Sequence, residues 1–135
     1  MRTALRTVIL FGVFYTAVGI AFGALAGSAA SDHARALWRL AAWILSAAAF
    51  GAQVWYERVR LRNPPRVSAW HASAAAALGA FGLAVAANIH ALGAVGAHRP
   101  RLLVALAAWP ILCGLPAFVI AWAAAAGLAF MRRGE

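Results

Sequence analysis

Apolar residues fill four long blocks of the chain, and short polar segments separate these blocks. The blocks cover residues 7–31, 40–56, 67–97 and 102–131. A helix needs about 20 predominantly apolar residues to cross the hydrocarbon core of a bilayer. The second block is short, but Leu37 and Trp38 extend it if the Arg39 side chain reaches back to the interface. The pattern predicts an all-α membrane protein, with four transmembrane helices in a bundle. We expect one domain over residues 1–135, with spans at about 7–29, 37–56, 67–97 and 102–131.

Residues that begin or end helices lie in the polar segments. Ser31 and Ser68 each precede an apolar block and are typical N-caps. The Asn-Pro-Pro sequence at 63–65 ends the second helix and predicts a tight connection to the third. Pro110 and Pro116 lie inside the fourth block, where each removes a backbone donor and is expected to bend the helix.

The composition favours a membrane protein over a soluble one. Hydrophobic residues make up 65% of the chain and charged residues 11%, whereas soluble domains contain about 25% charged residues. The formal net charge is +9, and the basic residues are all arginines, in short runs between the apolar blocks. We interpret these arginines as topology signals, and we expect the lipid bilayer as a partner and no nucleic acid.

The distribution of arginines predicts the orientation in the membrane. If the chain begins in the cytoplasm, eight arginines flank the cytoplasmic ends of the spans and four flank the outer ends. Both termini are therefore expected in the cytoplasm. Arginine without lysine, together with abundant alanine, is typical of GC-rich coding and favours a bacterial cytoplasmic membrane. The tryptophans are expected to form belts at the two interfaces: Trp38, Trp43, Trp55, Trp70, Trp109 and Trp122.

The first block has an alternative interpretation as a secretory signal peptide. It follows the basic sequence MRTALR, and it ends in small residues that are typical of a cleavage site after Ala26. The apolar run is longer than the roughly 7–15 residues of a signal peptide. We therefore expect a retained helix.

Two segments share a pattern that predicts an internal repeat. Residues 33–45 and 98–112 both run from a histidine through arginines to Leu-Ala-Ala-Trp and then Ile-Leu. The offset is 66 residues up to the shared tryptophan and 67 after one proline is inserted in the second copy. The larger offset also aligns Gly12 with Gly79. Two helices in each half give the hypothesis of a parallel 2+2 repeat.

Small residues line one face of the first block at every fourth position, and a similar set lies on the third block. Such stripes let helix backbones approach closely. The stripe is either a packing face within the bundle, which we expect, or an interface with a second copy. The packing residues are Gly19, Gly23 and Gly27 on the first block, and Gly82, Ala86 and Gly93 on the third.

His90 and Asn88 are the candidate polar site in the third block. The repeat aligns His90 with Gly23, and helical spacing places His90 beside the small face. We therefore expect His90 to point into the bundle near the outer membrane edge and to pack against the Gly23 region. Asn88 lies about 200° away around the helix and faces elsewhere.

Ligands for a metal or a haem are few. His90 could be joined only by His33 or His98, which lie in connections, because His71 is at the opposite end of the third block. A bis-imidazole haem needs two histidines at one depth, and a zinc or copper site from these histidines lacks a close acid or thiol apart from Asp32. Cys113 is the only cysteine, so the chain has no intrachain disulfide. We expect no metal and no cofactor.

No acidic side chain is predicted inside the membrane, because the three Asp and Glu residues lie outside the blocks. This weakens proton-coupled transport and intramembrane proteolysis, which need titratable groups at depth. The sequence predicts no enzyme, but a non-enzymatic bundle that is an accessory subunit or self-associates. Two alternatives stay open: a transporter or channel for a small solute, and a haem or metal binder that uses His90.

Overall fold

The chain forms long α-helices that could each cross a membrane. The computed structural model describes residues 2–92 and 99–131, and within these ranges there are four helices and no strand. The helices are α1 (Arg2–Gly27), α2 (Asp32–Val59), α3 (Pro65–Leu92) and α4 (Arg99–Met131). All four are long and apolar enough to span a bilayer. The predicted all-α membrane architecture is confirmed.

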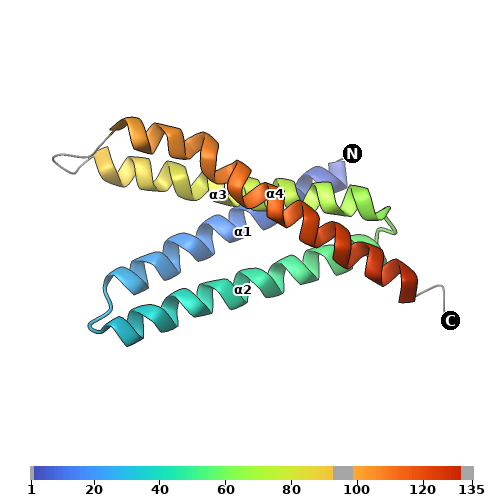
Figure 1. The fold of residues 1–135 in the computed structure, drawn as a ribbon, viewed down its shortest axis with the longest axis horizontal. Coiled ribbons are helices and arrows are strands. Elements are labelled where there is room, and N and C mark those ends of the chain that lie inside the picture. Colours follow the sequence, from blue (N-terminus) through green and yellow to red (C-terminus); the bar gives the residue numbers. More distant parts are fainter. Residues whose placement is uncertain (1, 93–98, 132–135) are drawn as a thin grey trace.

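The helices form two antiparallel hairpins that cross each other (Figure 1). α1 packs with α2 and α3 packs with α4, while α1 also packs against α3 at the crossing. We call the end where α1 begins, α4 ends and α2 is connected to α3 the terminal end. The opposite end is the distal end, and there the two hairpins diverge (Figure 1).

The helix starts agree only in part with the sequence. Ser31 is the N-cap of α2, with an extended backbone and a side-chain oxygen that accepts from the Ala34 N–H at 3.1 Å. The expected cap at Ser68 is wrong, because α3 begins at Pro65. Proline suits the first helical position, where its missing N–H has no intrahelical partner. Ser68 instead lies one turn inside α3, and its N–H donates to the Pro64 carbonyl.

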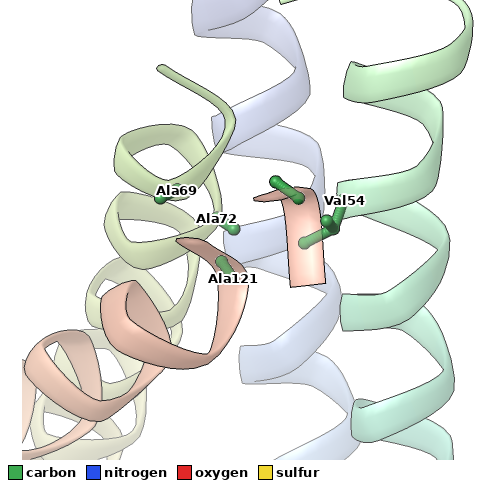
Figure 2. Packing of buried hydrophobic residues seen from close by; sticks show 5 residues of the cluster. Val54, Ala69, Ala72 and Ala121 are labelled. Carbon is green, nitrogen blue, oxygen red and sulfur yellow. The ribbon is translucent and has the colours of Figure 1, made fainter. Parts of the chain in front are cut away.

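The core near the terminal end is built from small residues. Val54 of α2, Ala69 and Ala72 of α3, and Ala121 and Ala125 of α4 form one buried cluster (Figure 2). In lipid, helices gain little from burying apolar area, so close van der Waals packing holds them together. Alanine permits this close packing and brings the ends of three helices to one place.

α1 and α3 cross through glycines. A Cβ at Gly12 would lie 2.6 Å from Leu78, and a Cβ at Gly79 would lie 2.6 Å from the Cβ of Tyr15. Thr16 fills the space beside Gly82, and its hydroxyl donates to the Gly12 carbonyl at 3.0 Å. Gly12 and Gly79, which the repeat hypothesis aligns, thus both lie at the crossing. The repeat itself stays a prediction.

Candidate functional site

Glu57 is a fully enclosed acid in the last turn of α2. Its side chain is 0% exposed, and it lies within the candidate span Asp32–Val59. Protein covers this carboxylate, and the expectation that no acidic side chain lies within the membrane stays a prediction. In the sequence, Glu57 directly follows the second apolar block. In the structure, α2 continues to Val59, and Asn63 and His71 contact the Glu57 carboxylate.

Two side chains hold the Glu57 carboxylate. Nδ1 of His71, on α3, lies 2.9 Å from Oε1 and 2.8 Å from Oε2. Nδ2 of Asn63 donates to Oε2 at 2.6 Å. The His71 side chain is 23% exposed, whereas that of Glu57 is closed. The pair therefore consists of an enclosed carboxylate and a partly exposed imidazole.

The connection between α2 and α3 folds back over the end of α2. The Asn63 N–H donates to the Glu57 carbonyl at 3.0 Å, and the Arg60 N–H donates to the Tyr56 carbonyl at 2.9 Å. Arg62 makes the reversal with a φ of 52°, in the left-handed region that non-glycine residues seldom adopt. Asn63 thereby contacts Glu57 with both its backbone and its side chain.

Arg58 joins the same end of the bundle to α4. Its Nε donates to the Ala125 carbonyl at 3.2 Å, and its guanidinium also donates to the Asn63 carbonyl. A cation in the last turn of a helix is favoured by the helix dipole. Glu57 and Arg58 are adjacent in α2 but contact different helices, since Glu57 binds α3 and Arg58 binds α4.

Two more enclosed polar side chains flank the pair: Gln53 lies one turn further into the bundle than Glu57, and Ser68 lies one turn nearer the terminal end than His71. Gln53 is 0% exposed, and its Oε1 accepts from the Tyr15 hydroxyl at 3.5 Å. Gln53 Nε2 and the hydroxyl of Ser68 are enclosed and have no hydrogen-bond partner among the described residues. Enclosed polar groups without a partner are costly and rare. We call Glu57, His71, Asn63, Gln53 and Ser68 the polar cluster.

A cleft opens between α1 and α2 near the distal end. Its volume is about 320 Å³. Glycines form much of its lining, Phe22 and Trp43 lie at its sides, and two arginines also line it; the full set is Gly19, Phe22, Gly23, Ala26, Gly27, Arg35, Arg39, Ala42 and Trp43. Arg35 is paired with Asp32 at 2.7 Å. We call this the distal cleft.

The predicted glycine stripe is divided between the crossing and the distal cleft. Gly19 contacts Leu83 of α3. A Cβ at Gly23 or at Gly27 would meet nothing within 4 Å. Ala86 is half-buried, and Gly93 lies outside the described residues. Among the described glycines of the stripe on α1, those near the crossing pack against α3, and Gly23 and Gly27 are open.

The expected contact between His90 and the Gly23 region is wrong. His90 is exposed, and the space beside Gly23 is open. The physical reason is the divergence of the hairpins, which carries α3 away from α1 beyond Gly19. Asn88 donates from Nδ2 to the Ala84 carbonyl of its own helix at 2.8 Å.

The remaining predicted site residues are the six tryptophans and the histidines of the candidate metal set. All six tryptophans are exposed, from 38% for Trp38 to 76% for Trp43, which suits lipid contact, and the belts stay a prediction. No group of three His, Cys, Asp or Glu side chains gathers in the described part of the chain. His98, a member of the candidate metal set, lies outside the described residues.

Sequence reasoning missed the polar cluster, although a signal for it exists. Gln53 and Glu57 are spaced four apart, and Ser68 and His71 three apart, so each pair shares a helix face. The two pairs flank the tight connection at 63–65. Polar faces on both sides of a tight turn meet if the turn folds the helices together.

Comparison with protein-family models, with curated proteins and with solved structures finds no match to this chain.

Proposed function

We propose that the chain is a non-enzymatic membrane bundle that self-associates through the distal cleft. The observation that carries this proposal is the open outer part of the glycine stripe. A Cβ at Gly23 or Gly27 would meet nothing within 4 Å among the described residues, although these glycines continue the stripe that packs α1 against α3. An open small-residue groove allows a second transmembrane helix to approach closely.

The symmetry of insertion supports this interface. Two copies inserted in the same direction have their distal clefts at the same depth. A two-fold axis along the membrane normal can therefore bring the same face of each copy together, which is the commonest form of homodimer. In this arrangement the glycines of each α1 accept side chains of the other copy.

The polar cluster supports the non-enzymatic part of the proposal. His71 is hydrogen-bonded to Glu57 alone among the described residues, so no hydroxyl or thiol there is activated by the imidazole. The Glu57 carboxylate is enclosed and braced by Asn63. This end of the molecule has the features of a clamp between helices.

Counting single molecules in liposomes tests self-association. Tagged wild-type protein is expected to bleach in two steps at high protein density and in one step after dilution with lipid. Replacing both Gly23 and Gly27 by leucine fills the cleft, so one-step bleaching is expected at every density. The matched control is the Gly51→Leu, Gly127→Leu protein, because these glycines are equally open but lie outside the cleft.

The same variants test the role of accessory subunit. If the partner is a different chain, a second protein co-purifies from native membranes with the wild type and the control but not with the Gly23→Leu, Gly27→Leu protein. A wild type that bleaches in one step at every density and brings no second chain contradicts both forms of the proposal.

We place the bundle in a bacterial cytoplasmic membrane with both termini in the cytoplasm. The even number of spans puts the start of α1 and the end of α4 on one side, and most arginines of the chain flank that side. A fluorescent protein that folds only in the cytoplasm, fused after residue 135, is expected to fluoresce. The orientation is contradicted if this fusion stays dark and a reporter enzyme that works only in the periplasm is active when fused at the same position.

Transport of a small solute is a second candidate, favoured by one observation. Polar side chains extend from Glu57 at the terminal end, through Gln53, to Tyr15 in the middle of α1. Intramembrane ionisable groups often mark solute pathways. Solute flux into liposomes that is lost in Glu57→Gln and kept in Asp32→Asn would support transport.

A further inference from the structure

The lining of the distal cleft changes from cationic to apolar along α2. This helix begins at Asp32, at the distal end of the molecule (Figure 1). From there, Arg35, Arg39 and Trp43 of the lining lie about 4.5, 10.5 and 16.5 Å along the helix axis. A 28-residue helix is about 42 Å long, so when centred on the ~30 Å hydrocarbon core it extends about 6 Å beyond each edge. The cleft therefore runs from the interfacial layer into the hydrocarbon layer.

We propose that the distal cleft binds one anionic phospholipid, and that this lipid competes with self-association. The phosphate would contact Arg39 and Arg35, and the first part of one acyl chain would lie along the glycines. The lipid site depends on the cleft alone. The competition rests on the self-association proposed above, because the lipid and a helix of the second copy would fill the same space.

Arg39 is a cation without an acid partner among the described residues. Asp32 pairs with Arg35 at 2.7 Å, and Glu57 lies at the opposite end of α2. The Cα of Arg39 lies about 4.5 Å inside the hydrocarbon edge by the lengths given above, where an unpaired charge is costly. Side chains lean toward the N-terminus of their helix, which for α2 is the interface. The guanidinium is therefore directed toward the level of the lipid phosphates.

The charge of the cleft suits a phospholipid with one net negative charge. The two arginines of the lining and the acid paired with one of them leave a single positive charge. Asp32 is 96% exposed, and exposed ion pairs contribute little stability, so the Arg35 guanidinium is available to a phosphate. Arginine binds phosphate oxygens through parallel N–H groups. A zwitterionic lipid also carries a cation, which the same arginines repel.

The inner part of the cleft suits an acyl chain. A Cβ at Gly23 or Gly27 would meet nothing within 4 Å, so a chain can lie against the backbone of α1 there. Phe22 and Trp43 form apolar sides. The volume of about 320 Å³ is at the lower end of the roughly 300–1,000 Å³ of ligand pockets. It suits a phosphate and the beginning of one chain, while the rest of the lipid stays in the bilayer.

Binding of tritiated phosphatidylglycerol to the full chain, in neutral micelles diluted to one copy each, tests the lipid site apart from self-association. It should bind about tenfold more tightly than phosphatidylcholine with the same chains. Arg39→Gln should lose about tenfold in affinity for phosphatidylglycerol. The matched control Arg66→Gln, at an exposed position of the terminal end, should keep it. Asp32→Asn should bind this lipid more tightly, because it releases Arg35.

Equal affinities for the two lipids, or equal losses in Arg39→Gln and Arg66→Gln, overturn the lipid site. Misfolding cannot imitate the expected pattern, since Asp32→Asn and Arg39→Gln should shift the affinity in opposite directions. Glycerophosphoglycerol, which is the headgroup without chains, should not displace the bound lipid. Displacement by this compound at the concentrations at which the lipid itself competes would indicate a site for phosphate alone and overturn the proposal.

Single-molecule bleaching in liposomes of the two lipids tests the competition. At one protein density, phosphatidylglycerol should lower the fraction of two-step molecules for the wild type and leave it unchanged for Arg39→Gln. An equal wild-type fraction in both lipids overturns the competition, whereas the measured lipid affinities still decide the lipid site. One-step bleaching in both lipids contradicts self-association, and with it the competition, so failure of the lipid site and failure of the proposed function are distinguishable.

Discussion

Nδ1 of His71 lies 2.8 Å from Oε2 of Glu57, and this contact joins the last turn of α2 to the second turn of α3. The two residues are 14 positions apart, on either side of the Asn-Pro-Pro connection. The contact closes the terminal end of the bundle, because Asn63 covers the same carboxylate and the neighbouring Arg58 holds α4.

Removing the imidazole should destabilise the bundle strongly. In His71→Ala the enclosed Glu57 loses its ring partner, and breaking a buried ion pair on one side costs about 3–5 kcal/mol. The free energy of unfolding in mixed detergent should fall by roughly the lower of these values, because His71 is partly exposed.

Two further variants show whether the loss of stability in His71→Ala comes from the uncompensated Glu57 carboxylate. His33→Ala, at an exposed position, should unfold like the wild type. The double variant His71→Leu, Glu57→Leu should be more stable than His71→Ala, because it has no uncompensated charge. A double variant no more stable than His71→Ala would contradict the assignment of the loss to Glu57.

A methyl group at Gly79 should weaken the crossing of α1 and α3. Its Cβ would lie 2.6 Å from the Cβ of Tyr15, an atom that no side-chain rotation can move away. Overpacking of this kind costs about 1–3 kcal/mol. Gly51→Ala, where a Cβ meets nothing within 4 Å, should be stabilising because alanine favours helix. Equal stabilities of the two variants, measured by thermal unfolding in detergent, would argue against this crossing.

Changes at Asn63 should depend on the chemistry of the new side chain. Asn63→Ala removes a hydrogen bond to a charged, enclosed carboxylate, which is worth about 1.5–3 kcal/mol. Asn63→Asp keeps the shape but places a second acid against Glu57, so it should be less stable than Asn63→Ala at neutral pH. Urea unfolding in detergent micelles measures the order, and the reverse order would contradict the contact between Asn63 and Glu57.

Glycine should have opposite effects at two neighbouring arginines of the connection. Arg62 has a φ of 52°, a conformation that costs an L-residue about 1–2 kcal/mol and glycine almost nothing. Arg62→Gly should therefore be neutral or stabilising by about 0.5–1 kcal/mol after the entropy of glycine is included. Arg60 has helical angles, so Arg60→Gly should destabilise by about 0.5–1 kcal/mol. Two equal losses would show that the left-handed turn at Arg62 does not form.

The internal repeat aligned His90 with Gly23, but this alignment did not predict a contact between the two residues. An offset in the sequence relates positions along two helices, but it does not contain the angle at which the helices cross. α1 and α3 touch at Gly12, Thr16 and Gly19 and then separate. His90 and Gly23 occupy aligned positions and yet have no contact, because they lie beyond the crossing.

The sequence by itself determined the four membrane-spanning helices and the cap at Ser31. Hydropathy, span length and capping are properties of one segment, so they can be read without knowing what the segment packs against. Only the tertiary structure decided that Glu57 is enclosed and that Gly23 is open. Burial depends on the crossing angle of the hairpins and on the connection that folds Asn63 back over α2, and both bring together residues that are distant or differently oriented along the chain.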